Sequence, residues 1–219
     1  MESISTILWD VGGVLLTNGW DHQQRTAVLA RFGLDRDDFE RRHAAVDAAW
    51  EKDEISADEY LQHTVFFEPR TFTQAAFLDA MREQSTLLPD SAISILRDLA
   101  ASDEQEYVLA TVNNESRIMN EFRLAQFDLL ELYDAFFSSC YVGLRKPDRK
   151  IYQLALDVLQ RDPEEVVFID DRAENAAAAA SLGIHAICYK GSAQLAEELA
   201  RLGVSAGQNH AQDRQLREA

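Results

Sequence analysis

The apolar positions of this chain follow two patterns, which change near residue 88. A short apolar run, Ile4–Trp9, predicts a buried strand that ends at Asp10. From residue 20 to about residue 84 the apolar residues instead recur at helical spacing. We expect four helices in this stretch, at residues 21–32, 37–50 and 56–66 and from Thr71 or Thr73 onwards. The third begins with a capping box, Ser56-Ala-Asp-Glu59, in which two side chains bond free N–H groups of the first turn.

After Pro89 the pattern becomes an alternation of strands and helices. Strands are predicted at Glu106–Val112, Ala135–Cys140, Val166–Ile169 and Ile184–Tyr189. Helices are predicted at Ser91–Ala101, Glu115–Ala125, residues 151–159, Glu174–Leu182 and Ser192–Leu202. Apolar strands that alternate with amphipathic helices are typical of a parallel sheet covered on both faces, so the expected fold class is α/β with a Rossmann-like core.

The helical stretch interrupts this core after its first strand. It is far longer than the crossover that normally joins parallel strands. We therefore expect residues 1–17 and 88–204 to form the core, and residues 18–87 to form an inserted helical cap domain. The two connections fall near Thr17–Trp20 and Thr86–Pro89. Residues 205–219 are polar and are expected to be a disordered tail.

Composition and charge exclude several classes of partner. The 219 residues are 47% apolar, which is typical of a globular protein, and 21 Lys and Arg face 38 Asp and Glu, a net charge of −17. Such a charge repels nucleic acid and anionic membranes, and an anionic substrate needs local positive charge or a metal ion. Cys140 and Cys188 lack metal-binding spacing, so we expect reduced, buried thiols. Without a signal peptide or a membrane span in the sequence, the expected location is the cytoplasm.

Polar residues follow several of the predicted strands. In an open parallel sheet, ligands bind beyond the carboxyl ends of the strands. The candidates at these ends are Asp10, Thr111 with Val112 and Asn113, Lys146, and the pair Asp170–Asp171. Asp10 is followed by Gly12-Gly13, which leave the backbone open to a ligand, and a carboxylate at a strand end can act as a nucleophile.

Each candidate also has an ordinary structural explanation. Asp10 is a common residue type in turns, Thr111 is a β-branched residue of the kind found in strands, and Lys146 can be an ordinary solvated lysine on the surface. Asp171, with Glu174 three residues later, suits a helix N-cap. Together, however, three carboxylates, a hydroxyl and a lysine gather where a ligand site belongs, which the separate explanations do not account for.

Four motifs, in this order, resemble those of the haloacid dehalogenase-like (HAD) superfamily. They are WDVGGV at Asp10, LATVNN at Thr111, GLRKPDRKIY at Lys146 and VVFIDDRAEN at Asp170–Asp171. The resemblance covers nearly the whole chain apart from the tail, and the helical insert is similar to the C1-type cap of that superfamily. It implies hydrolysis of phosphate monoesters, in which Asp10 attacks the phosphorus in line and water then hydrolyses the aspartyl-phosphate.

The resemblance also implies a cofactor and a role for each motif residue. Mg²⁺, which prefers oxygen ligands, would be held by Asp10, the Gly12 carbonyl and the Asp170–Asp171 pair, with Asp171 as the direct ligand. Lys146 would neutralise charge on the nucleophile and on the phosphoryl group. The remaining phosphate contacts would come from Thr111, Val112, Asn113 and nearby backbone N–H groups.

One position departs from the pattern of most phosphatases in this superfamily. The second residue after the nucleophile is usually an aspartate that serves as general acid and base, and here it is Gly12. Positioned acid–base catalysis is typically worth about 10²–10⁴ in rate. The site is therefore slower or uses another proton donor, for which the sequence offers Asp21, His22, Asp53 and Glu54.

Two alternatives to a phosphatase stay open. A metal-independent 2-haloacid dehalogenase uses an aspartate nucleophile on carbon and also lacks an acid at this position. It does not need adjacent aspartates such as Asp170–Asp171, which repel each other and Asp10 unless a cation is present. The other alternative is a catalytically idle relative that binds phosphate or a metal ion.

The substrate is predicted only by class. A cap that closes over the site excludes water and contacts the leaving group. Trp20 and the stretch WEKDEIS (residues 50–56) are candidate specificity elements, and their mixed character suggests a small phosphorylated metabolite with a polar leaving group, such as a sugar. The sequence does not determine the oligomeric state.

Overall fold

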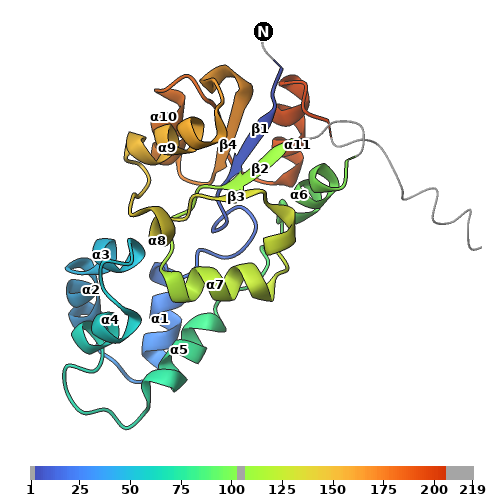
Figure 1. Cartoon of the computed structure of the whole chain (residues 1–219). Helices are drawn as coiled ribbons and strands as arrows, with labels where there is room; N and C mark the ends of the chain where they lie inside the picture. The colour runs from blue at the N-terminus through green and yellow to red at the C-terminus, as the bar shows by residue number, and fades with distance from the viewer. Residues whose placement is uncertain (1–2, 103–106, 206–219) are drawn as a thin grey trace, which may run out of the picture.

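The computed structural model describes residues 3–102 and 107–205 of the chain (Figure 1). Its strands are β1 (Thr6–Trp9), β2 (Val108–Thr111), β3 (Ala135–Phe136), β4 (Val166–Asp170) and β5 (His185–Cys188). Its α-helices are α1 (His22–Arg31), α2 (Arg36–Ala44), α3 (Asp47–Glu51), α4 (Ala57–Thr64), α5 (Gln74–Arg82), α6 (Ile93–Ala100), α7 (Arg117–Gln126), α8 (Ser139–Val142), α9 (Arg149–Leu159), α10 (Ala173–Ala180) and α11 (Ser192–Arg201). Two short 3₁₀ helices, η1 (Leu130–Leu132) and η2 (Pro163–Glu165), complete the elements.

The strands form one parallel sheet in the order β3-β2-β1-β4-β5. Trp9 at the end of β1 is in register with Thr111 on one side and with Ile169 on the other. Asp10 therefore leaves the sheet at the centre of its carboxyl edge, between the ends of β2 and β4. This is the α/β core that the sequence predicts.

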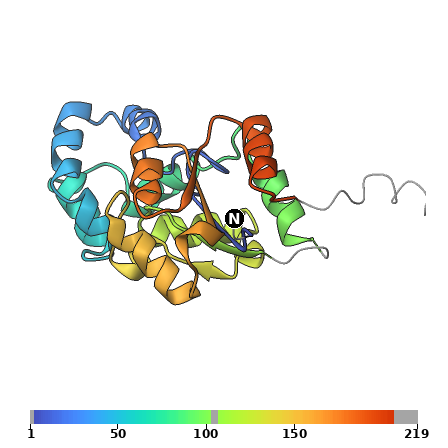
Figure 2. The ribbon, with the colours of Figure 1, turned by 90° about the horizontal axis from the view of Figure 1, so that it is seen from above.

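Helices cover both faces of this sheet (Figures 1 and 2). Successive residues of a strand point to opposite faces, and β1 follows this rule. Trp9 is buried in a cluster with Leu96 of α6 and Leu195 of α11. Leu8 is buried in a second cluster with Tyr152 of α9. The sheet is thus enclosed except at its edges, and its carboxyl edge is where polar groups can collect.

The helices α1–α5 lie between β1 and β2 in the chain and form a separate group beside the carboxyl edge (Figure 1). The capping box is present as predicted, with Ser56 and Glu59 bonded to each other's backbone N–H groups. The single helix expected at 37–50 is instead two helices, α2 and α3, because the chain leaves the helical conformation at Val46, whose φ is −133°. This break lets Trp50 stack on Tyr60, with ring centroids 3.8 Å apart.

The two connections between this helical group and the core run side by side. Leu16 and Leu87 form an antiparallel bridge, and the N–H of Thr17 donates to the carbonyl of Thr86 at 2.9 Å. Arg123 of α7 donates to the carbonyl of Thr17 at 2.6 Å. Thr17 and Thr86 thus lie in the two segments that join β1 to α1 and α5 to α6.

Some expectations outside the site need correction. The strand expected at Ala135–Cys140 ends at Phe136, because the chain turns at Ser138 into α8, and Cys140 lies on that helix. Both cysteines are free, but only Cys140 is buried, whereas Cys188 is partly exposed. Apart from Ser205, the tail expected at residues 205–219 lies outside the described residues, as does Glu106 of the second predicted strand. Among the described helices, none combines the length and the apolar character that a bilayer-spanning segment needs.

Candidate active site

Three carboxylates meet at the carboxyl edge of the sheet. Asp10 directly follows β1, Asp170 is the last residue of β4, and Asp171 comes next. Since β1 and β4 are neighbours in register, their ends deliver these side chains to the same place. One carboxylate oxygen from each of the three lies within 4.8 Å of the others. Residues separated by about 160 positions in the sequence thus form one acidic cluster.

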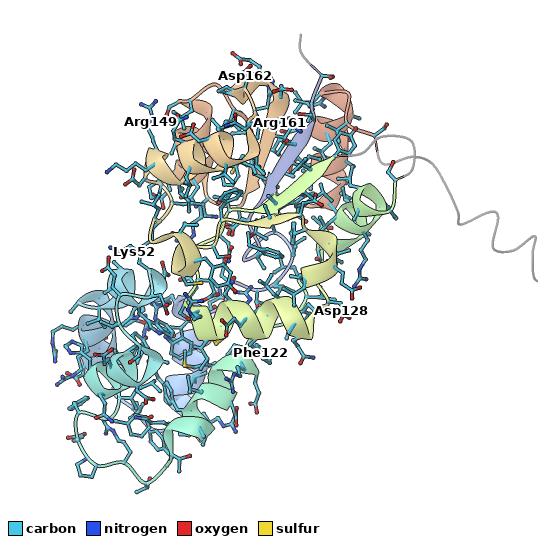
Figure 3. The ribbon with its side chains drawn as sticks, viewed as in Figure 1. Lys52, Phe122, Asp128, Arg149, Arg161 and Asp162 are labelled. Atoms are coloured by element: carbon cyan, nitrogen blue, oxygen red, sulfur yellow. The ribbon has the colours of Figure 1, made fainter. Side chains whose placement is uncertain are left out.

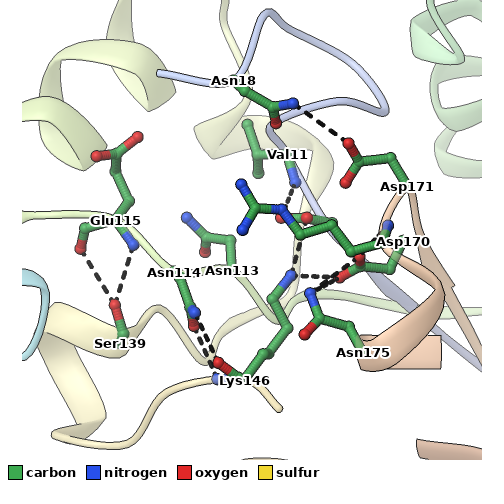
Figure 4. Close-up of polar contacts among 12 residues, drawn as sticks. Val11, Asn18, Asn113, Asn114, Glu115, Ser139, Lys146, Asp170, Asp171 and Asn175 are labelled. Atoms are coloured by element: carbon green, nitrogen blue, oxygen red, sulfur yellow. Dashed lines mark hydrogen bonds and ion pairs between the residues drawn. The ribbon is translucent and has the colours of Figure 1, made fainter. Parts of the chain in front are cut away.

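Lys146 lies among these carboxylates. Its Nζ is 2.9 Å from Asp10 Oδ2 and 2.6 Å from Asp170 Oδ2, and its side chain is 1% exposed. Asn114 fixes the backbone of Lys146 on both sides, since its amide donates to the Lys146 carbonyl and accepts from the Lys146 N–H (Figure 4). A single ammonium group therefore offsets part of the charge of three carboxylates.

The hydrogen-bond partners of Asp170 and Asp171 differ sharply. Asp170 accepts from Lys146, from the amide of Asn175 at 3.0 Å to both oxygens, and from the N–H of Arg172 at 2.8 Å. Among the described residues, the carboxylate of Asp171 accepts only from Asn18, at 3.2 Å to Oδ2, and its Oδ1 is buried without a hydrogen-bond partner. Asp170 is thus held in place, whereas Asp171 presents an unused oxygen to the cluster (Figure 4).

The backbone after Asp10 is shaped for close approach. Gly13 has a φ of +73°, a conformation that glycine adopts without strain. A Cβ at this residue would lie 2.1 Å from Asp171 Oδ2. The absence of a side chain at Gly13 is therefore what allows Asp171 to reach the cluster.

The donor set fits a hard divalent cation. Carboxylate oxygens come from Asp10, Asp170 and Asp171, and the Gly12 carbonyl accepts no hydrogen bond from any residue that the structure describes. Mg²⁺ prefers such oxygen ligands. The orphaned Asp171 Oδ1 is the clearest sign of a missing positive partner.

Burial controls the protonation of these groups. It raises the pKa of Asp10 to about 7, and Asp170 and Asp171 add to the rise while Lys146 opposes it. The pKa of Asp171 is raised as well, mainly by burial. Burial lowers the pKa of Lys146, but the carboxylates of Asp10 and Asp170 outweigh burial and raise it overall, so the ammonium form persists. A bound cation would favour the ionised carboxylates.

A cavity of about 660 Å³ opens beside the cluster. On the core side it is lined by Asp10, Gly12, Asn113 and Lys146, and on the helical side by residues of α1–α3. Lys52, which follows α3, lies where the helical group meets the core, whereas Asp162 lies at the end of the core away from the helical group (Figure 3). The cavity is therefore placed to hold a small molecule between the acidic cluster and the helices.

Residues 4–183 match the family model of haloacid dehalogenase-like hydrolases. The chain belongs to this family. Its sheet order, its helical insertion between β1 and β2 and its acidic cluster thus agree with the resemblance inferred from the motifs.

Three known proteins illustrate what this hydrolase is similar to. It is 28% identical to flavin mononucleotide hydrolase 1 of Arabidopsis thaliana over 179 residues, which cover 81% of this chain and 71% of that protein. It is 32% identical to (S)-2-haloacid dehalogenase 1 of Pseudomonas sp. (strain CBS-3) over 118 residues, or 54% of this chain and half of the dehalogenase. A crystal structure of a HAD family enzyme from Bacteroides thetaiotaomicron, in complex with magnesium and inorganic phosphate, matches with a TM-score of 0.73 at 20% identity, over 86% of this chain and 96% of that one. The structural match shows a shared fold.

Not all of the predicted phosphate-binding residues reach the cavity of the hydrolase. Asn113 lines it, but Thr111 and Val112 do not. Thr111 shares a strand face with Leu109, which packs in the cluster against α6 and α11, and Val112 packs in the opposite cluster. The Thr111 hydroxyl has no hydrogen-bond partner among the described residues. Thr111 and Val112 thus do not line this cavity, and their role in binding phosphate stays a prediction.

Backbone N–H groups at this edge of the sheet are further candidates for binding an anion. The Asn113 side chain bonds Ser138 and Asn120 rather than the cavity. By contrast, the N–H groups of Gly12, Asn113 and Asn114 have no acceptor within the described part of the chain. Free N–H groups in a loop at a sheet edge form a suitable cradle for an anion.

The candidate proton donors are dispersed. Asp21 lines the cavity and pairs with Arg172 at 3.1 Å. His22 contacts Arg36, and neither His22, Asp53 nor Glu54 lines the cavity. Of the four candidate proton donors, Asp21 is the one that lines the cavity.

Three residues of the site were not singled out from the sequence. Asn18, which bonds Asp171, stands before Gly19 in a turn, and Asn-Gly is a turn signal without chemical meaning by itself. Arg145 pairs with Glu51 of α3 at 2.6 Å, and both line the cavity. Glu51 belongs to the WEKDEIS stretch, and Arg145 precedes Lys146, so proximity to motifs was the only signal available.

Proposed function

We propose that this hydrolase is a Mg²⁺-dependent phosphatase that cleaves small phosphate monoesters through an aspartyl-phosphate on Asp10. The observation that carries the proposal is the meeting of Asp10, Asp170 and Asp171 within 4.8 Å around one lysine. A site with this excess of negative charge needs a further cation before it can bind an anionic ester.

Each residue of the site has a role in this proposal. Asp10 Oδ attacks the phosphorus, a P–O bond forms to Asp10, and the ester oxygen leaves with the bonding electron pair. Lys146, 2.9 Å from Asp10, keeps the nucleophile oriented and offsets charge on the phosphoryl oxygens. The free N–H groups of Gly12, Asn113 and Asn114 donate to those oxygens. Water then attacks the phosphorus and releases Asp10 and inorganic phosphate.

Magnesium would be held by Asp10, Asp171 and the Gly12 carbonyl, with Asp170 close by. Bound there, the ion supplies positive charge to the phosphoryl group and to the attacking carboxylate. Asp170 is occupied by Lys146 and Asn175, which supports a role in orienting Lys146 or in reaching the metal through water. Asp171, with its unpartnered Oδ1, suits direct ligation.

The helices α1–α5 would act as the cap, with residues 18–87 as the inserted domain and residues 1–17 and 88–204 as the core. They cover the cavity from the side opposite the acidic cluster, so a leaving group would contact α1–α3. We infer a small phosphorylated metabolite as substrate and the cytoplasm as the location. Two free cysteines, Cys140 and Cys188, support a reducing compartment.

The acidic pair weighs against a metal-independent dehalogenase. Asp171 would place a further carboxylate beside the nucleophile and raise its pKa, which hinders attack on carbon. An idle, phosphate-binding relative would keep the metal site without turnover. The experiment that separates these functions measures phosphate release from p-nitrophenyl phosphate and halide release from 2-chloropropionate, each with Mg²⁺ and with EDTA.

The outcomes are distinct. Phosphate release that requires Mg²⁺ and is lost in Asp10→Asn supports the phosphatase. Halide release in EDTA supports the dehalogenase. Magnesium binding without either product supports the idle relative.

A further inference from the structure

The helical wall of the cavity carries two acidic side chains, Asp47 and Glu51 of α3, whose oxygens are hydrogen-bond acceptors. His43 of α2 and Trp50 of α3 also line it. Trp50 stacks on Tyr60. Asp47 is 3.6 Å from Arg145, beyond hydrogen-bond distance, so its oxygens can accept from a ligand.

Every cationic side chain that lines the cavity already has an acidic partner. The pairs are Arg25–Glu40 (2.8 Å), Arg123–Glu115 (2.6 Å), Arg145–Glu51 (2.6 Å), Arg172–Asp21 (3.1 Å) and Lys146 with Asp10 (2.9 Å) and Asp170 (2.6 Å). Over residues 3–102 and 107–205, the cavity therefore offers no uncommitted guanidinium or ammonium group. A second anion on a substrate would therefore have to compete with a carboxylate that is already paired with the cation.

The net charge of the residues that line the cavity also disfavours a second anionic group on the substrate. Eight acidic side chains line the cavity against five cationic ones. Burial raises the pKa of Asp10 and of Glu51 to about 7, so the excess of negative charge develops as the pH rises through that value. His43 adds no positive charge at neutral pH, because burial, together with Arg25 and Arg145, lowers its pKa to about 4. Away from the phosphate subsite, the lining therefore repels anions.

The chemistry of the wall defines the complementary ligand. Glu51 and Asp47 carry acceptor oxygens, and a hydroxyl group can donate to them, whereas a carboxylate or phosphate group has only acceptors to offer. A cavity of about 660 Å³ has room for a leaving group with several hydroxyl groups.

We propose that the cavity selects phosphate esters whose leaving group is uncharged and bears hydroxyl groups, and that it rejects esters with a second anionic group. Arg145, held by Glu51 and Asp47, is the cation that such a group would otherwise capture. This selectivity rests on the proposed phosphatase function and names the substrate class of that same site.

The test uses pairs of open-chain esters in which one CH₂OH group is replaced by a carboxylate: sorbitol 6-phosphate against 6-phosphogluconate, and glycerol 3-phosphate against 3-phosphoglycerate. We expect kcat/KM for the anionic member to be lower by about 30-fold or more, from one extra like charge a few ångströms from the wall. A ratio within about threefold, or a preference for the anionic member, overturns the proposal.

A variant identifies the source of the selectivity. Glu51→Gln removes the charged partner that lies nearest to Arg145, so kcat/KM for the anionic ester should rise relative to kcat/KM for the uncharged one. The ratio of the uncharged to the anionic value should fall by about tenfold. Asp98→Asn, which makes the same charge change on exposed α6 away from the cavity, should leave the ratio as in the wild type. An equal change in both variants would show a general charge effect and would overturn the assignment to this wall.

Binding separates this inference from the proposed reaction. If neither ester of a pair releases phosphate although p-nitrophenyl phosphate is hydrolysed, or if no ester at all is turned over, dissociation constants are measured for the same compounds with Asp10→Asn and Mg²⁺. Tighter binding of sorbitol 6-phosphate than of 6-phosphogluconate supports the selectivity even without turnover. Equal constants, or no binding of sorbitol 6-phosphate, overturn it.

Discussion

The carboxylate of Asp171 occupies the space in which a side chain on Gly13 would have to lie. A Cβ at Gly13 would be 2.1 Å from Asp171 Oδ2, although the two residues are separated by most of the sequence. Gly13 of the first motif and Asp171 of the fourth motif are therefore in direct contact, and the missing side chain of Gly13 leaves room for the Asp171 carboxylate. The sequence motifs are explained by this contact more directly than by a need for a flexible turn.

Gly13→Ala should therefore weaken the magnesium site as well as the fold. An alanine at positive φ costs about 1–2 kcal/mol by itself, and at Gly13 the methyl group also displaces Asp171. Gly33→Ala is the matched control, since Gly33 has a φ of +63° but open space around its Cβ position. Calorimetric titration with Mg²⁺ should show at least a tenfold loss of affinity in Gly13→Ala and none in Gly33→Ala. Equal affinities in the two variants would contradict this account of the contact.

Lys146→Met should leave Asp10 and Asp170 without their shared counter-ion. Breaking a buried ion pair by removing one partner typically costs about 3–5 kcal/mol. The loss in the free energy of unfolding should be largest near pH 8 and smaller near pH 5, because protonation at low pH relieves the repulsion between the carboxylates. Phosphate release should fall by about 10²–10³. Urea unfolding at both pH values measures the stability, with the exposed Lys190→Met as control, and a pH-independent difference would argue against the counter-ion role.

Glu51 should make the protein less stable as the pH rises. Burial raises the pKa of Glu51 from 4.5 to about 7, with Arg145 opposing the rise. Between these values the unfolded chain releases this proton and the folded protein keeps it, so stability falls with rising pH and levels off above pH 7, by up to about 3 kcal/mol. Glu51→Gln abolishes this contribution. Its stability relative to the wild type should therefore improve from pH 5 to pH 8 in urea unfolding, and an unchanged difference would show that Glu51 ionises normally.

The absence of a side chain at Gly12 should be visible in the choice of leaving group. Without a positioned acid, the leaving oxygen departs unprotonated, and the rate depends strongly on its basicity. Across a series of substituted phenyl phosphates, kcat/KM should fall steeply as the pKa of the phenol increases. A flat dependence would reveal a proton donor elsewhere in the cavity, and Asp21→Asn would then be the first variant to compare, since Asp21 lines the cavity.

Local patterns predicted the elements that depend on local interactions. The capping box of Ser56 and Glu59 forms as expected, and Asp10 and Asp170 lie at strand ends because apolar runs stop at them. The meeting of these ends follows from the parallel sheet, so the acidic cluster was predictable as soon as the fold class was recognised.

What failed depended on contacts between distant segments. The break at Val46 between α2 and α3 is not marked by glycine or proline, and it is explained by the packing of Trp50 on Tyr60. Thr111 and Val112 do not line the cavity, because the register of β2 in the sheet decides which residues reach it and the motif alone does not fix that register; their role in phosphate binding stays a prediction. The pairing of Arg145 with Glu51 joins core to insert, and no local pattern encodes it.

The most direct measurement of the central claim is a search for phosphate on Asp10 itself. The wild-type protein, mixed with p-nitrophenyl phosphate and Mg²⁺ and quenched in acid during the first turnover, is digested and examined by mass spectrometry. The account predicts one phosphoryl group on the peptide that contains Asp10, and none when EDTA replaces Mg²⁺ or when Asp10→Asn is used. Steady turnover with no phosphoryl group on Asp10, or turnover by Asp10→Asn at the wild-type rate, would contradict it.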